Sequence, residues 1–258
     1  MSSAEFPGEL AAAGLTLVGV GPGNPELLTV AAVRAIRAAA VVAYPVAREG
    51  ADGMAARIAA PWIGPQQRRL PLLFPMVAGA EPRQAAWHSA AAALAAEVAA
   101  GHAVVLLCEG DASLYASASY ALLALAERHP ACPVAVIPGI TAVAAAAAAA
   151  SSQGLPWPLA LQQDALLIRP TPDGAEELAA LLQRACGEGM VLALLKLGHR
   201  WAWVRPLLAE RGLLAASLFA QRVGWPDQLL APAAEVPADE QPYFSLLLIR
   251  QSWPAVLP

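Results

Sequence analysis

Three loops contain the residue types most suited to binding a ligand, and each follows an apolar stretch of the chain. They are Val18–Pro25 (VGVGPGNP), Leu106–Tyr115 (LLCEGDASLY) and Val136–Ala142 (VIPGITA). In a parallel α/β sheet, ligands bind where strands end, and glycine lets the backbone approach them closely. Glycine N–H groups, two carboxylates and a hydroxyl at such ends indicate a small polar ligand with amine or hydroxyl groups.

The first loop does not fit the familiar phosphate-binding sites. A dinucleotide site needs G-x-G-x-x-G and an acidic residue at the end of the second strand. Here the spacing is G-x-G-P-G, and the second strand is expected to end at Tyr44–Pro45 without a carboxylate. The Gly-Lys-Ser/Thr of a nucleotide-binding P-loop is also absent. A dehydrogenase is therefore disfavoured, and a purely structural turn stays an alternative.

The second and third loops offer acceptors and a hydroxyl. Glu109 and Asp111 suit hydrogen bonds from an amine or from ribose, and Gly110 is expected to sit where only hydrogen fits. Two acids are too few oxygen ligands for calcium, while a solvated turn stays an alternative. Thr141 suits either a helix cap or a ligand contact.

The elements around these loops alternate between short apolar runs and longer amphipathic or alanine-rich segments. Asn24 and Pro25 fit the start of the first helix. We expect strands at residues 15–20, 41–44, 103–108, 134–137, 165–169, 190–196, 217–223 and 243–250. We expect helices at residues 24–39, 54–58, 81–100, 119–128, 141–151, 175–185 and 201–211.

This alternation predicts an α/β fold. It falls into two blocks, which predicts domains at residues 1–117 and 118–258. The last strand alternates partly between polar and apolar residues, so it is expected to be antiparallel to its neighbours.

The composition of the chain argues against nucleic acid, a membrane and a metal ion as partners. Of 258 residues, 58% are apolar, and the net charge is −4 without any basic run, which argues against nucleic acid. The longest apolar candidate, Ile140–Ala150, is too short to span a membrane. The first residues carry Glu5 and Glu9 and no basic residue, unlike a signal peptide, so a cytoplasmic location is expected. Three cysteines and four histidines show no metal-binding spacing; we expect no metal and reduced, mostly buried cysteines.

Taken together, the three loops resemble the successive motifs of the tetrapyrrole methylases. The combination of G-x-G-P-G, G-D-x-x-x-Y and P-G-I-T-A in this order is specific, and the resemblance runs from about Leu15 to Arg250. Further segments resemble the branch that methylates C20 of precorrin-2: Val41–Val46, Leu70–Met76, Lys196–Gly198 and Pro242–Leu246.

The resemblance implies a two-domain fold, with a mostly parallel N-terminal sheet on the tetrapyrrole side, a mixed C-terminal sheet on the donor side, and a cleft between them. It implies a homodimer that uses S-adenosylmethionine to methylate a tetrapyrrole. The residues that it places near the methyl donor are Pro22, Glu109, Gly110, Asp111, Leu114, Thr141, Ala142, Leu197 and Val223.

No general base stands out, and Tyr115 and Glu109 are the weak candidates. Precorrin-2 carries eight carboxylates, so arginines are expected around it; the candidates are Arg48, Arg83, Arg169 and Arg200. The chain departs from the family in having Ala112 for a proline and Gln162–Gln163 where an arginine is common. Alternatives are a methylase for cobalt-factor II or another corrin intermediate, and a binding protein that has lost catalysis.

Overall fold

The computed structural model describes residues 13–77 and 79–254. The chain forms two compact units, divided between Thr141 and Ala142. The boundary expected between residues 117 and 118 falls inside the first unit. The reason is strand pairing: β5 (Val134–Ile137) lies beside β1 (Gly14–Gly19), which keeps this later segment in the first sheet.

The first unit is built on a five-stranded sheet of order β3-β2-β4-β1-β5. Every pairing in it is parallel, as expected. Its other elements, in chain order, are η1 (Pro25–Leu27), α1 (Val30–Ala38), β2 (Val41–Val46), α2 (Met54–Ala59), η2 (Ala60–Trp62), β3 (Arg68–Leu73), α3 (Ala80–Ala99), β4 (Ala103–Cys108) and α4 (Ala118–Arg128).

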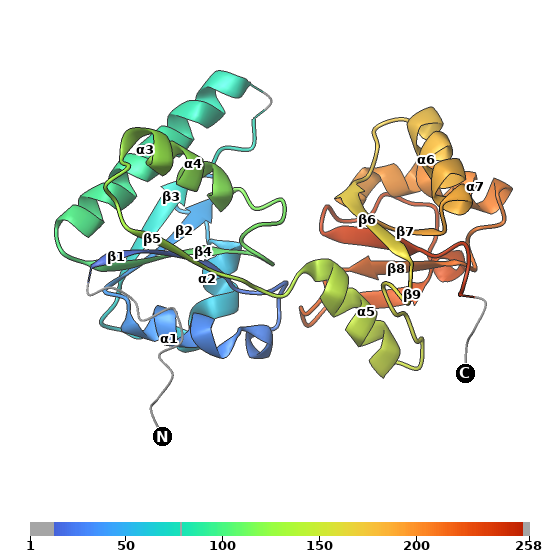
Figure 1. Cartoon of the computed structure of the whole chain (residues 1–258), viewed down its shortest axis with the longest axis horizontal. Helices are drawn as coiled ribbons and strands as arrows, with labels where there is room; N and C mark the ends of the chain where they lie inside the picture. Colours follow the sequence, from blue (N-terminus) through green and yellow to red (C-terminus); the bar gives the residue numbers. More distant parts are fainter. Residues whose placement is uncertain (1–12, 78, 255–258) are drawn as a thin grey trace. The chain divides into compact units, whose positions relative to one another are not determined.

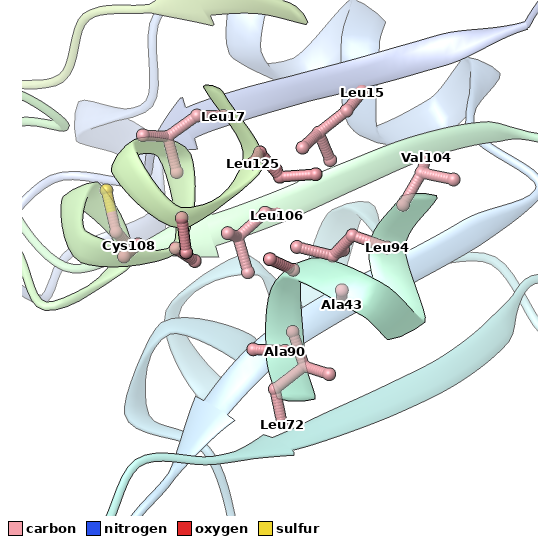
Figure 2. Close-up of a cluster of buried hydrophobic side chains, with 14 of the residues drawn as sticks. Leu15, Leu17, Ala43, Leu72, Ala90, Leu94, Val104, Leu106, Cys108 and Leu125 are labelled. Carbon is pink, nitrogen blue, oxygen red and sulfur yellow. The ribbon is translucent and has the colours of Figure 1, made fainter. Parts of the chain in front are cut away.

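Helices cover both faces of this sheet, with α3 and α4 on one face and α1 and α2 on the other (Figure 1). The three inner strands, β2, β4 and β1, are nearly continuous apolar runs because both of their faces are buried, whereas the edge strands β3 and β5 are more exposed. Figure 2 shows Leu17, Leu106 and Cys108 from the strands packed with Leu94 of α3 and Leu125 of α4. This core holds the strand ends, and therefore the three loops, in fixed positions.

The second unit has a mixed sheet of order β6-β7-β10-β8-β9. The strand β10 is antiparallel to both β7 and β8, which confirms the expectation for the last strand. Its elements are α5 (Ala142–Ser152), β6 (Ala165–Pro170), α6 (Ala175–Gly187), β7 (Met190–Leu195), η3 (Gly198–Arg200), α7 (Trp201–Glu210), β8 (Ser217–Gln221), β9 (Leu229–Pro232), η4 (Ala233–Glu235) and β10 (Ser245–Ile249). Its core centres on Trp201 and Phe219, whose rings are 5.2 Å apart.

Two strands, β3 and β9, were not expected from the sequence. Both are edge strands, and both contain a proline, Pro71 or Pro232. Proline has no N–H to donate to a neighbouring strand, so its presence argues against a strand in the sequence. It is tolerated at a sheet edge, where one side of the strand is unpaired. Pro45 likewise does not end β2, because the pairing of β2 with β4 stops at Ala43 and the strand continues against β3.

Two further expectations need correction. The first helix is in fact two: the Asn24 side chain caps the short η1, and Thr29 caps α1 by accepting from Ala32 at 3.1 Å. The cysteines are free but not mostly buried: Cys108 is buried, Cys132 half-buried and Cys186 exposed. Cys186 lies near the end of α6, away from that helix's apolar face. In residues 13–77 and 79–254, no helix combines the length and apolarity needed to span a bilayer.

Candidate functional site

The three loops of the first unit meet because their strands are neighbours. In the sheet, β1 lies between β4 and β5, and parallel strands end at the same edge. Beyond the strand ends, Gly21 and Gly110 form a pair of backbone hydrogen bonds, with N···O distances of 3.1 and 2.8 Å. The loop after β1 is thereby joined to the loop after β4.

The loop after β5 packs against both of the others through glycine. A Cβ atom on Gly139 would lie 2.1 Å from the carbonyl oxygen of Gly110, and one on Gly19 would lie 2.6 Å from the Gly139 nitrogen. Neither position has room for a side chain. Gly19 and Gly139 were not among the residues singled out from the sequence, although the G-x-G and P-G patterns that contain them were the available signal.

Gly110 needs glycine for a different reason from the one expected. A Cβ atom there would meet only the Ile140 oxygen, at 4.0 Å, so the expectation that only hydrogen fits is wrong. Its φ of +65° is what favours glycine, because other residues are strained in that region. The space beside Gly110 is therefore open, at the centre of the three loops.

Asp111 holds the second and third loops together. One carboxylate oxygen accepts from the Ser113 backbone N–H at 2.8 Å and from the Ser113 hydroxyl, and the other accepts from the Gly139 N–H at 2.8 Å. Burial disfavours ionisation of Asp111, but these hydrogen bonds outweigh it, so its pKa lies below the usual range. Both carboxylate oxygens are engaged within the protein, so Asp111 positions the loops, whereas direct donor contact by it stays a prediction.

The remaining candidates of the first unit line these loops at intermediate exposure. Pro22, Glu109, Leu114 and Thr141 are all half-buried, as a lining residue should be. Tyr115 is 47% exposed and has a φ of +53°, which is rare for a bulky residue. Ala112 is buried in the core, and its carbonyl accepts from the Ser119 hydroxyl at 2.7 Å.

In the second unit, the strands β6, β7 and β8 end at one edge of the sheet, and β10 begins there. Ser245, the first residue of β10, fixes the turn after β7. Its carbonyl accepts from Leu197 N at 3.0 Å, and its hydroxyl accepts from Gly198 N at 3.1 Å and donates to Pro242 O at 2.7 Å. Ser245 is buried, so these bonds are shielded from water.

The donor-side candidates lie at this edge, but their side chains face inward. Leu197 is completely buried in the core of the second unit, and Val223, after β8, is 6% exposed. Any ligand contact of Leu197 would therefore use its backbone. Ala142 is the first residue of α5, directly after Thr141, and is half-buried.

The arginines proposed for substrate carboxylates are largely engaged elsewhere. Arg200 donates from Nε at 3.0 Å and from Nη2 to Asp173, and from Nη1 to the Lys196 carbonyl at 3.3 Å. Arg169 pairs with Glu177 at 2.7 Å. Arg83 donates from Nε to the Gly79 carbonyl. Within the described residues, no group of three His, Cys, Asp or Glu side chains is arranged to hold a metal ion.

The family model for tetrapyrrole (corrin/porphyrin) methylases matches residues 14–236, which covers both units and all three loops. The chain belongs to this family. The methylase chain is 33% identical over 243 residues to the cobalt-precorrin-2 C(20)-methyltransferase of Salmonella typhimurium, covering 93% of this chain and 97% of that protein. It is 34% identical over 240 residues to the precorrin-2 C(20)-methyltransferase of a Sinorhizobium species, covering 90% and 93%.

Solved structures agree on the fold of this methylase. The crystal structure of the methyltransferase CobJ matches with a TM-score of 0.66 at 23% identity, covering 92% of this chain and 94% of that one. Uroporphyrin-III C-methyltransferase from Thermus thermophilus, complexed with S-adenosylhomocysteine, matches with a TM-score of 0.59 at 23% identity, covering 92% and 97%.

Proposed function

We propose that this methylase transfers a methyl group from S-adenosylmethionine to C20 of precorrin-2, or of its cobalt complex, in corrin biosynthesis. The observation that carries the proposal is the extent of the two matches to C20-methyltransferases. At 33–34% identity, each match covers at least 90% of this chain and at least 93% of the relative. Because one relative is named for the cobalt form and the other for the metal-free form, identity does not separate these two substrates.

The geometry suits binding of a methyl donor. Gly110 has open space beside it, and Glu109 and Leu114 of the same loop are half-buried. The donor would rest on the joined loops, with Pro22 and Thr141 contributing from the neighbouring loops. Leu197, Val223 and Ala142, which belong to the second unit, stay proposed donor contacts on the family resemblance.

The donor supplies an electrophilic methyl group on sulfonium, and the substrate supplies a carbon made nucleophilic by the conjugated pyrrole nitrogens. Holding the two in line accounts for much of the rate in such transfers, up to about 7–11 kcal/mol in favourable intramolecular cases. A residue then has only to accept or steer the proton released from that carbon. Glu109 and Tyr115 are the candidates on the second loop, and we expect Glu109→Gln or Tyr115→Phe to lower kcat more than donor affinity if either has this role.

We also infer a homodimer acting in the cytoplasm, with a tetrapyrrole as its small-molecule partner. Sedimentation of the purified chain would give the oligomeric state directly. A single species with the mass of one chain, at the concentration used for the assay, would contradict the dimer.

The test of the function begins with calorimetric titration of S-adenosylhomocysteine into the purified chain. We expect micromolar binding at one site per chain, lost in Gly110→Arg, whose side chain would fill the open space. Gly101→Arg is the matched control, because Gly101 also has a positive φ and open surroundings but lies just past α3.

Turnover with precorrin-2 and with cobalt-precorrin-2 would then identify the substrate. Product from either one supports a C20-methyltransferase. Donor and tetrapyrrole binding without any product would instead indicate a binding protein that has lost catalysis. Wild-type donor affinity in a folded Gly110→Arg variant would contradict the donor site.

A further inference from the structure

Arg222 is held in an unusual backbone conformation where β8 ends. Its φ is +47°, a region that costs non-glycine residues of order 1–3 kcal/mol and is enriched at ligand clamps and active sites. Its N–H donates to the Phe244 carbonyl at 2.8 Å, next to the residue that fixes the turn after β7. The backbone therefore aims this side chain from the same edge that holds Leu197 and Val223.

The Arg222 side chain is fixed at one end only. Its Nε donates to Asp227 at 2.8 Å, and its guanidinium carbon lies 5.2 Å from the centroid of the Trp225 ring. Asp227 and Trp225 belong to one short loop, which is closed by Trp225 N donating to Arg222 O at 3.0 Å. The guanidinium is thus oriented before any ligand arrives.

The other end of the guanidinium is available. Neither Nη atom of Arg222 hydrogen-bonds to any residue in the described part of the chain, and the side chain is 27% exposed. Arg200, in contrast, donates from Nε and both Nη atoms to Asp173 and Lys196. A paired set of Nη donors, on a guanidinium held over an indole ring, matches the geometry of a carboxylate.

A second positive charge lies close by in the fold. Lys196 follows β7, and the antiparallel β10 separates β7 from β8, so the two backbones are about 10 Å apart at the usual strand spacing. Lys196 also has a positive φ, of 56°. Two cationic residues with positive φ therefore follow neighbouring strand ends at this edge, where Asp227 is the acid paired with Arg222.

We infer that the Nη atoms of Arg222 bind a carboxylate of a ligand in the proposed reaction, an inference that rests on the proposed function. Two ligands there carry carboxylates: the tetrapyrrole, with eight, and the methyl donor, with one. The tetrapyrrole is the expected source because it presents carboxylates around its whole rim.

The test uses the full chain and three probes. Uroporphyrin, a stable octacarboxylate porphyrin, is titrated in the presence of S-adenosylhomocysteine; S-adenosylhomocysteine and methylthioadenosine, which lacks the carboxylate, are titrated alone. The variants are Arg222→Gln, which removes the charge, and Arg222→Lys, which keeps the charge but not the paired donors. Arg184→Gln is the matched control, because Arg184 also pairs with an acid, Glu188, but lies on α6.

We expect Arg222→Gln to weaken uroporphyrin binding about tenfold, as for loss of a charge-assisted hydrogen bond, with Arg222→Lys in between and Arg184→Gln unchanged. If Arg222→Gln weakens binding of S-adenosylhomocysteine but not of methylthioadenosine, the inference is also supported. The carboxylate bound by Arg222 is then that of the methyl donor. Unchanged affinity for every probe in a folded Arg222→Gln protein would overturn it. If the wild type binds S-adenosylhomocysteine and produces methylated precorrin-2 while Arg222→Gln matches it throughout, the inference fails and the proposed function stands.

A wild-type protein that binds none of the probes contradicts both the Arg222 inference and the proposed function. Loss of folding is monitored by the thermal midpoint. If Arg222→Gln unfolds, Arg222→Lys gives the same comparison, because lysine keeps the charge and removes the paired Nη donors.

Discussion

The carboxylate of Asp111 accepts a 2.8 Å hydrogen bond from the backbone N–H of Gly139, which lies 28 positions later in the chain. The bond joins the loop after β4 to the loop after β5. Asp111 also accepts from Ser113 within its own loop, so one side chain fixes two of the three loops proposed to hold the donor.

Asp111→Asn should therefore weaken both stability and donor binding. An amide can replace one acceptor, but its NH2 group cannot accept from Gly139 N–H. We expect a loss of about 1 kcal/mol in unfolding free energy, because the part-buried Gly139 N–H loses its acceptor. Chemical denaturation and calorimetry with S-adenosylhomocysteine measure the two effects. A variant with unchanged stability and unchanged affinity would show that the loops do not depend on this bond.

The same carboxylate predicts a pH dependence. Its pKa is lowered in the folded state, so the folded protein binds fewer protons at this site than the unfolded chain. Its contribution to stability is present above the unfolded pKa of about 3.9 and is lost as pH falls through the folded value. We expect the stability of Asp111→Asn to approach that of the wild type below about pH 4. Parallel curves down to pH 2 would contradict this assignment.

Gly139→Ala should disrupt the junction of the loops. The added methyl group would lie 2.1 Å from the Gly110 oxygen, and backbone atoms on both sides leave it nowhere to move. We expect at least about 1–3 kcal/mol of destabilisation, as for overpacking, together with weaker donor binding. Gly187→Ala is the control, because nothing lies within 4 Å of its Cβ position and it falls within α6. Equal melting temperatures for the two variants would contradict the close packing.

Ser245→Ala should loosen the turn after β7. It removes the acceptor of Gly198 N–H and the donor to Pro242 O at a buried position. We expect the free energy of unfolding to fall by about 1–3 kcal/mol, because the buried Gly198 N–H is left without an acceptor. Donor affinity should fall as well. Ser117→Ala, at an exposed serine whose side chain does not cap α4, should change neither quantity. Unaltered affinity in Ser245→Ala would show that this turn does not contribute to donor binding.

The three thiols should react at different rates. Burial, followed by the charges of Asp111 and Glu109, raises the pKa of Cys108 to about 12, so it has almost no thiolate at pH 8. Cys186 is exposed and should be alkylated first, and Cys108 last. Mass spectrometry of peptides after timed iodoacetamide treatment would rank them. Rapid labelling of Cys108 in the native state would mean that the β4 loop opens readily.

The sequence by itself determined the alternation of strands and helices and the three loops. These are local properties: apolar runs, glycine at sharp turns and residues such as Asn24 at helix starts are fixed by near neighbours in the chain. They were enough to predict an α/β fold and the antiparallel final strand, while the mostly parallel first sheet was implied by the family resemblance. The motif order was also enough to indicate the methylase family.

Only the tertiary structure decided how those residues work. Edge position is what allows Pro71 and Pro232 to lie in strands, and it depends on which strands remain unpaired. The sequence marks Asp111 as an acceptor but not that Gly139 is its donor. It suggests Arg200 for a carboxylate, whereas Asp173 and the Lys196 carbonyl occupy that side chain, and Arg222 keeps its Nη atoms available. The Asp111–Gly139 and Arg200–Asp173 pairs join residues 28 and 27 positions apart, so no local pattern contains them.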